Sequence, residues 1–127
     1  MKLYTDPRSP AHNITAHGPG WVAVDGRRYE RSLLVAGAHV DAAWGPDDFA
    51  ALSAAHLAPL ATLGCDVVLL GTGQRQHFPA PVVLRPLIEA RIGVEVMDTA
   101  AACRTYAILA AEGRKVAAAL IVERDAA

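Results

Sequence analysis

The sequence is poor in the residues on which several classes of protein depend. It holds two cysteines, which are too few to make a four-ligand zinc site alone. Its 12 basic and 13 acidic residues nearly cancel, so its charge does not recruit nucleic acid. No apolar run approaches the ~20 residues that a membrane-spanning helix needs. We therefore expect no structural zinc, no nucleic-acid partner and no membrane span.

The N-terminal residues also lack the features of a sorting signal. Residues 1–11 have no apolar core typical of a secretory signal and no Arg/Ser-rich amphipathic pattern typical of a mitochondrial presequence. They contain Pro7 and Pro10 without any periodicity, which predicts an extended or disordered lead-in. With the cysteines expected to stay reduced, we predict a cytoplasmic protein. Residues 12–124 show no shift in composition and are predicted to form one domain.

Alternating apolar and polar residues predict β structure in the first part of this domain. Ile14 opens one alternating run, residues 21–24 form a second, and Asp25-Gly26 between the second and third runs is a strong hairpin signal. A third strand is predicted over residues 28–36, with a bend near Arg31. Together these strands make an antiparallel meander.

A loop and a short helix are predicted next. Residues 37–48 are expected to form a loop in which Trp44 closes an edge of the core, or else serves as an exposed anchor for a partner. Ser53 is a plausible N-cap for a helix over residues 54–63. Pro59 lies inside that segment, so the helix should be short or kinked.

The second half alternates strands with helices. The apolar run 66–71 ends at a glycine turn and is typical of a strand buried on both faces. Helices are predicted over 81–91 and 100–112, with strands over 94–97 and 115–122. The first helix should end at Gly93, and the second should start with Thr99 as its N-cap and end at Gly113. These elements predict a three-layer α/β domain, a mixed sheet with parallel central strands, crossover helices and the N-terminal meander.

The pattern of apolar residues also predicts which face of each helix is buried. For the first helix the predicted buried residues are Leu84, Leu87 and Ile88. Arg85 and Glu89 should pair on another face of that helix. For the second helix the predicted buried residues are Ala101, Ala102, Thr105, Ile108 and Leu109, while Cys103, Arg104 and Ala107 should point away.

A series of short motifs in this half resembles a known family. The motifs are Gly71-Thr72-Gly73, Arg75, Phe78-Pro79, residues 93–99 and residues 102–106. In this order they resemble a family of small proteins of unknown function that includes the mitochondrial NADH:ubiquinone oxidoreductase complex assembly factor 3. The resemblance covers residues 18–122 and implies a three-layer α/β fold with little chemistry. The chain departs from the family at Ala107, where an asparagine often follows the aromatic residue, so any polar contact of that asparagine is missing.

The candidate site lies where the parallel strands end, because open parallel sheets bind ligands at that edge. Backbone N–H groups of the glycine turn and of the following helix start, together with two arginines, would attract a small anion there. Alternatively, the glycines only permit a turn and close packing. The candidate ligand-binding residues are Gly71, Thr72, Gly73, Arg75, Asp98, Thr99 and Arg104, with Phe78, Cys103 and Tyr106 as further candidates.

Several of these residues also have simpler structural interpretations. Asp98 and Arg104 would form a buried ion pair that braces the helix start, and Tyr106 would belong to the core or its rim. The basic group Arg27, Arg28 and Arg31 is typical of a solvated face.

Catalytic chemistry is poorly supported by the same residues. Cys103 lies near a helix start, where the helix dipole favours a thiolate, and His77 is the one histidine predicted near it. A third orienting residue is not evident, and the five histidines show no metal-binding spacing. These features favour a non-enzyme without cofactor or metal.

The leading hypothesis from the sequence is a non-catalytic binding or assembly module. The resemblance implies that residues 71–78 and 97–106 form a surface that docks a respiratory-complex subunit, another assembly factor or a small anion. One alternative is an enzyme or binding protein for a small anionic metabolite at the same site. Another is a structural homo-oligomer that packs through an alanine-rich surface.

Overall fold

The computed structural model describes residues 11–123. Nearly all of the predicted lead-in, and residue 124, lie outside this range. The elements in chain order are β1 (Ile14–Gly18), β2 (Trp21–Val24), β3 (Arg27–Tyr29), β4 (Leu33–Ala36), β5 (His39–Asp41), the 3₁₀ helix η1 (Phe49–Ala51), α1 (Ala54–Leu57), the 3₁₀ helix η2 (Ala58–Thr62), β6 (Val67–Gly71), α2 (Pro81–Glu89), β7 (Gly93–Met97), α3 (Thr99–Ala111) and β8 (Val116–Leu120).

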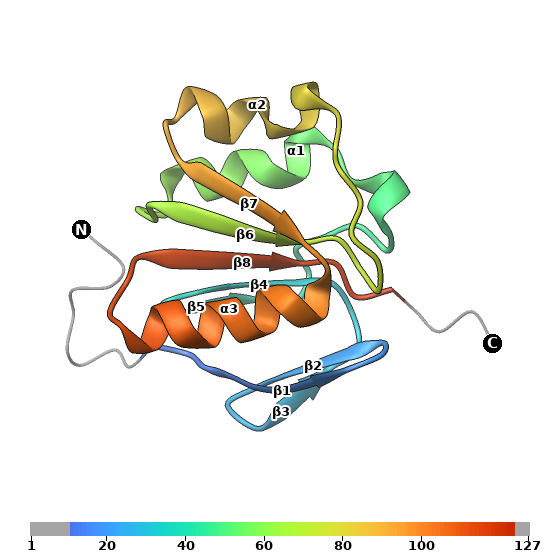
Figure 1. The fold of residues 1–127 in the computed structure, drawn as a ribbon, viewed down its shortest axis with the longest axis vertical. Coiled ribbons are helices and arrows are strands. Elements are labelled where there is room, and N and C mark those ends of the chain that lie inside the picture. Colours follow the sequence, from blue (N-terminus) through green and yellow to red (C-terminus); the bar gives the residue numbers. More distant parts are fainter. Residues whose placement is uncertain (1–10, 124–127) are drawn as a thin grey trace.

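A five-stranded mixed sheet forms the centre of the molecule, with the strand order β5-β4-β8-β6-β7. β6 pairs in parallel with β7 on one side and with β8 on the other, while β4 is antiparallel to both β8 and β5. Gly71 lies opposite both Met97 and Leu120. The predicted parallel strands are therefore confirmed, and their carboxyl ends meet at one edge of the sheet (Figure 1).

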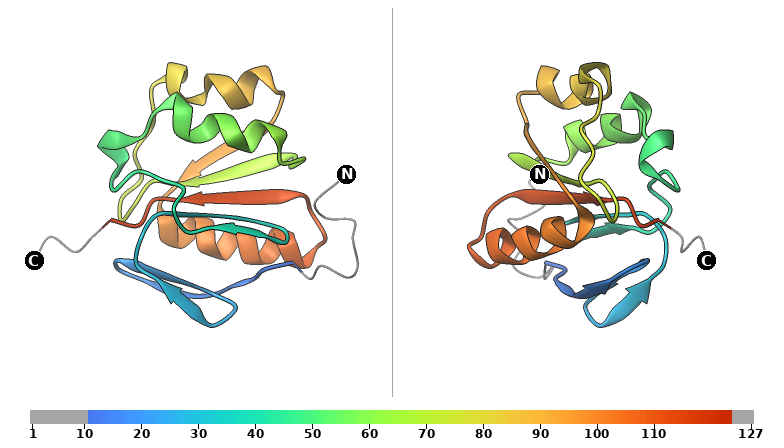
Figure 2. Two further views of the ribbon diagram at one scale, coloured as in Figure 1. Left: turned by 180° about the vertical axis from the view of Figure 1, so that it is seen from behind. Right: turned by 45° about the vertical axis from the view of Figure 1, so that its right-hand side comes forward.

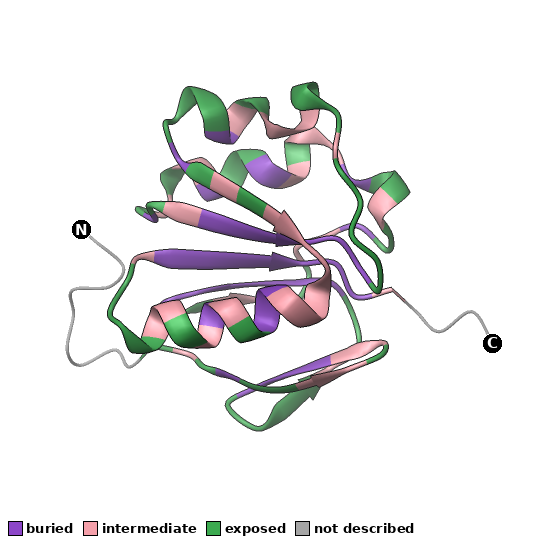
Figure 3. Cartoon of the chain, viewed as in Figure 1, coloured by how far each residue is buried: buried purple, intermediate pink, exposed green. Residues whose placement is uncertain are grey.

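Each face of this sheet is covered by a different layer. α1, η2 and α2 lie on one face, and α3 with the small sheet β1-β2-β3 lies on the other (Figure 2). Alternate residues supply the two cores: Leu69 and Ala118 face α3, whereas Leu70 and Ala119 face α1 and α2. The predicted three-layer α/β fold is confirmed. β6 and β8 are almost wholly buried (Figure 3), so the alanine run 117–119 lies in the core and not on the surface.

The N-terminal prediction is correct for β1 to β3 and wrong beyond them. The predicted strand 28–36 breaks after Tyr29, and the chain crosses to the large sheet, where β4 pairs with β8. Ser32 lies at the crossing and is buried, with its Oγ donating to the carbonyl oxygen of Pro46 and accepting the N–H of Val122 at 2.9 Å. β5, which pairs with β4, lies within the predicted loop. The alternation of residues continues through the crossing, so it could not reveal a change of sheet.

The region around α1 agrees with the sequence. Ser53 precedes α1, which is only one turn long and passes into η2 at Pro59. Trp44 closes the edge of the core, because its indole Nε1 donates to the carbonyl oxygen of His56 at 2.8 Å. η1 was not predicted; it is capped by Asp48, whose side chain accepts the N–H of Ala51.

The predicted buried face of α2 is partly wrong. Leu87 is buried, but Ile88 is 59% exposed. The helix ends before Gly93, because Arg91 adopts the left-handed conformation (φ 59°) and Gly93 opens β7. The expected pair of Arg85 with Glu89 is not among the ion pairs of residues 11–123.

The buried face of α3 differs from the prediction by about one position. Ala102, Cys103 and Tyr106 are buried, whereas Ile108 is 60% exposed. α3 contacts β6 and β8 on one side and β1 on another, so its buried surface follows two partners. Because alanines occur on several sides of this helix, its sequence pattern does not single out one buried face. Gly113 follows the helix with φ 76°, as predicted.

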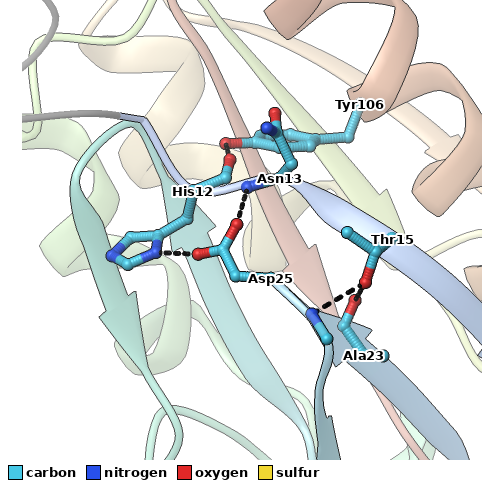
Figure 4. Close-up of polar contacts among 7 residues, drawn as sticks. His12, Asn13, Thr15, Ala23, Asp25 and Tyr106 are labelled. Carbon is cyan, nitrogen blue, oxygen red and sulfur yellow. Dashed lines mark hydrogen bonds and ion pairs between the residues drawn. The ribbon is translucent and has the colours of Figure 1, made fainter.

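A cluster of polar contacts fixes the start of β1 (Figure 4). His12 Nδ1 and Asp25 Oδ2 lie 2.5 Å apart, and the other carboxylate oxygen of Asp25 accepts the N–H of Asn13 at 2.9 Å. The hydrogen bond from His12 is the main cause that lowers the pKa of Asp25. The Tyr106 hydroxyl donates to the carbonyl oxygen of His12 at 3.2 Å, which ties α3 to the small sheet. The predicted hairpin turn is present, with positive φ at Asp25 and Gly26.

Residues 11–123 contain no helix that is both long enough and apolar enough to cross a membrane.

Candidate functional site

The glycine turn after β6 and the start of α3 are joined by backbone hydrogen bonds. The N–H of Thr72 donates to the carbonyl oxygen of Met97, and the N–H of Thr99 donates to that of Gly73, each at 2.9 Å. The N–H of Gly73 in turn donates to Thr99 Oγ1 at 2.9 Å. The two segments thus lie together at the carboxyl ends of the parallel strands.

The predicted N-cap of α3 is wrong by one residue. The N-cap is Asp98, whose Oδ1 accepts the N–H of Ala101 at 2.8 Å. Thr99 is the first residue of α3, and its hydroxyl donates to the carbonyl oxygen of Ile121 at 2.7 Å. Sequence alone could not separate these roles, because both residue types are good N-caps.

Gly71 allows α3 to approach β6 closely. A Cβ atom on Gly71 would lie 3.0 Å from the Cα of Thr99 and 3.2 Å from the Cβ of Ala102. Such contacts are tighter than ordinary van der Waals distances. Gly71 therefore has a packing role, which is the alternative that the sequence left open for it.

Thr72 organises the loop between β6 and α2. It is fully buried, and its hydroxyl donates to the carbonyl oxygen of Arg75 at 2.7 Å while accepting the N–H of His77 at 3.0 Å. Gln76 adds a bond from its Nε2 to the carbonyl oxygen of Val96, on the edge strand β7. The exposed part of this loop therefore has a defined conformation.

A carboxylate of the chain itself occupies the turn where an anion was expected. Glu123 Oε1 accepts the N–H of Gln74 at 2.9 Å. Gly73 has φ 106°, and a Cβ atom there would clash with this carboxylate. The N–H groups of the turn are thus paired within the chain, and a negative charge already lies beside them. This arrangement does not favour a second anion.

The two arginines of the anion hypothesis lie on the exposed surface. Neither Arg75 nor Arg104 is among the ion pairs of residues 11–123, so the predicted pair of Asp98 with Arg104 is not formed. Neither of them lines the cavity at this edge. The structure places the glycine turn, Asp98 and Thr99 together but does not direct the arginines at them.

That cavity has a volume of about 440 Å³ and was not predicted. It lies between the β1–β2 turn and the strand ends, and its lining comprises residues 17–21, Gly73, Gln74, Thr99, Ala100 and residues 121–123. The indole of Trp21 lies so close to Gly18 that a Cβ atom there would clash with it. On this indole the Arg28 guanidinium sits 4.5 Å from the ring centroid. In the sequence, the run Gly18-Pro19-Gly20-Trp21 was the one sign of this cavity, but such a run predicts only a turn.

The residues considered for catalysis do not form a catalytic group. Cys103 is 1% exposed, and burial raises the pKa of its thiol to about 12. His77 stacks on Phe49 with ring centroids 4.9 Å apart, and Tyr106 is buried with its hydroxyl on His12. Residues 11–123 also hold no cluster of three His, Cys, Asp or Glu side chains that would bind a metal.

The Cys103 thiol is expected to be unreactive in the folded protein. A thiol with a pKa of about 12 is almost wholly protonated at neutral pH, and only the thiolate is a good nucleophile. Treatment with iodoacetamide at pH 7 should therefore modify Cys103 at least about 100-fold more slowly than in urea-unfolded protein. Peptide mass spectrometry measures both rates, and rapid labelling of the folded protein would contradict the buried assignment.

An exposed aromatic residue marks the outer side of the strand-end loop. Phe78 is 77% exposed, and Val82, on the first turn of α2, is 55% exposed. The backbone beneath Phe78 is fixed by the bond from the N–H of His77 to Thr72. Aromatic side chains are enriched at protein-binding surfaces, so Phe78 is the candidate contact residue of this loop.

Comparisons with known proteins agree with this architecture. The model of a family described as proteins of unknown function (DUF498/DUF598) matches residues 14–121. An uncharacterized protein of Rhodobacter capsulatus is 36% identical over 91% of both chains. A crystal structure of a Bordetella parapertussis protein is 40% identical, with a TM-score of 0.85 over 92% of this chain and 100% of that one.

A shorter match points to a protein with an assigned role. The NADH dehydrogenase [ubiquinone] 1 alpha subcomplex assembly factor 3 of Bos taurus is 46% identical over 56 residues. These residues make up 44% of this chain and only 30% of the bovine protein.

Proposed function

The chain belongs to the DUF498/DUF598 family of proteins of unknown function, and we propose that it is a non-catalytic binding module for respiratory NADH dehydrogenase assembly. In this role it docks a subunit of that enzyme or another assembly factor. The docking surface is the strand-end surface, residues 71–78 and 97–106. The local identity to the assembly factor of Bos taurus supports the proposal.

The observation that carries this proposal is the exposure of Phe78 on a fixed loop. Burying such a side chain against a partner removes apolar surface from water, and little conformational entropy is lost because the loop is already ordered. Aromatic residues are among the commonest interface hot spots. Catalysis is less well supported, since Cys103 and His77 form no catalytic group.

The other functions considered from the sequence are less well supported. A site for an anionic metabolite would place its charge beside Glu123, whose carboxylate already accepts from Gln74. A homo-oligomer packed through alanines could not use the run 117–119, which is buried in β8, and no observation favours another alanine surface.

The Phe78→Ser substitution is expected to impair assembly of NADH dehydrogenase at least about tenfold while leaving the fold intact. Loss of an aromatic hot spot costs about 2 kcal/mol or more in binding, but Phe78 makes little contact within the chain. Native gel electrophoresis of membranes, from a strain in which the variant replaces the chromosomal copy, measures the assembled enzyme.

Ile108→Ser provides the matched control, because Ile108 is 60% exposed on α3 but lies outside the proposed surface. Both variants should unfold within about 0.5 kcal/mol of the unmodified protein. Equal assembly with Phe78→Ser and the unmodified chain would refute the proposed surface.

A further inference from the structure

The cavity between the β1–β2 turn and the strand ends has the size of a small-molecule site. Its volume of about 440 Å³ falls within the range of roughly 300–1,000 Å³ that is usual for ligand pockets. Phe78 is not among its lining residues. It therefore leaves out the residue on which docking rests, although Gly73, Gln74, Thr99 and Ala100 belong to both the cavity and the proposed docking surface.

The walls of this cavity are mainly apolar and well supported. Ile121 and Val122 are buried, and Ala100 comes from the first turn of α3. The indole of Trp21 forms an aromatic wall, held between Gly18 and the Arg28 guanidinium. A ring or short alkyl body would thus find a preformed apolar surface.

The formal charge of the lining residues is negative, and the Arg28 guanidinium, which lies on the Trp21 indole, is not part of the lining. The lining contains one carboxylate, Glu123, and neither lysine nor arginine; His17 is its other titratable residue. Glu123 Oε1 accepts from the N–H of Gln74, while no hydrogen bond or ion pair within residues 11–123 involves Oε2. A carboxylate oxygen that accepts no other hydrogen bond is a strong acceptor for a cationic N–H group.

We propose that this cavity binds an organic amine, with its apolar body against Trp21 and its ammonium group on Glu123. The charge-assisted bond selects for a cation, and the same carboxylate repels an anion of equal size. Gly73 makes this arrangement possible, since a side chain there would displace the carboxylate. The site thus lies beside the expected anion site but has the opposite charge preference.

Three probes of nearly equal size test this charge preference. They are 2-phenylethylamine, 2-phenylethanol and phenylacetate, which share a ring and differ in the polar end. Titration of each into the ¹⁵N-labelled protein at pH 7 should give shifts at Gly18, Trp21, Gly73 and Ala100. The amine should bind at least about tenfold more tightly than the alcohol, because a charge-assisted hydrogen bond replaces a neutral one, and the acid should bind most weakly.

Two variants with matched controls separate charge from shape. Glu123→Gln should remove the preference for the amine, whereas Glu112→Gln, at the exposed end of α3, should keep it. Ala100→Leu should fill the cavity and weaken amine binding at least about tenfold. Ala111→Leu places the same side chain at an exposed position of the same helix and should have no effect.

The proposal is overturned if no probe binds at 10 mM, if the alcohol or acid binds as tightly as the amine, or if shifts map away from the cavity. Unchanged binding to Ala100→Leu would overturn it too. Phe78→Ser should leave amine binding unchanged. The outcome is therefore independent of the assembly role, which rests on Phe78, outside the cavity.

Discussion

Replacing Gly71 by valine should lower the free energy of unfolding by about 2–4 kcal/mol. The new Cβ would lie 3.0 Å from the Cα of Thr99 and 3.2 Å from the Cβ of Ala102, and valine adds two methyl groups beyond it. Neither neighbour is a flexible chain end that can move aside, so β6 and α3 must separate. Overpacking of this kind costs about 1–3 kcal/mol, and disturbing the hydrogen bonds of Thr99 adds to it.

Gly93→Val is the matched control for this substitution. Gly93 also lies in a parallel strand, but a Cβ atom there has no neighbour closer than 3.7 Å, and the residue is exposed. Valine favours strands, so Gly93→Val should be neutral or stabilising. Urea unfolding measures both variants. Equal stability of Gly71→Val and Gly93→Val would show that Gly71 is not required for packing.

Replacing Tyr106 by alanine should lower the free energy of unfolding by about 3–5 kcal/mol. Tyr106 is 1% exposed and lies between the large sheet and the β1–β2 hairpin. Truncation leaves a cavity between layers that are fixed by other contacts, which is the costliest kind of core substitution. Tyr106→Phe removes only the bond to the carbonyl oxygen of His12 and should cost about 0.5–1.5 kcal/mol.

Thermal or urea unfolding of both Tyr106 variants provides the test. Ile108→Ala is the control on the same helix, because Ile108 is 60% exposed and should contribute within about 0.5 kcal/mol. A larger loss for Ile108→Ala than for Tyr106→Ala would mean that the face predicted from the sequence is the buried one after all.

The parallel part of the fold could be predicted because local signals agree with one another there. The apolar run before Gly71, the segment 93–97 and the run in β8 each have the length and composition of buried strands. The Asp25-Gly26 turn was equally clear, since few other structures need that pair. In these places the residues that favour the local structure also suit its place in the fold, so the sequence pattern is enough to predict it.

The errors fall where a tertiary contact decides between local alternatives. The crossing at Ser32 depends on the bonds of its hydroxyl with Pro46 and Val122, which are distant in sequence. The buried face of α3 is set jointly by the sheet and β1. No local periodicity carries that information.

The sequence predicted that the glycine turn and the start of α3 meet, but it did not predict the charged groups around them. The glycine turn and the helix start meet as their positions between strands and helices suggested. Glu123 follows the last strand without any motif around it, so its return to Gln74 could not be anticipated. The place of Trp21 in the cavity wall was not predicted either, because Trp21 is distant in sequence from the strand ends. Arg75 and Arg104 were predicted to hold an anion, but both are exposed and neither lines the cavity.

Phe78 is the proposed contact through which the strand-end surface binds a protein partner. A photoreactive benzoylphenylalanine at position 78, with position 108 as the exposed control, tests it most directly in living cells. Irradiation should link position 78, and not position 108, to a subunit or assembly factor of NADH dehydrogenase, as identified by mass spectrometry. An absence of such products at position 78, or the same products at both positions, would contradict the claim.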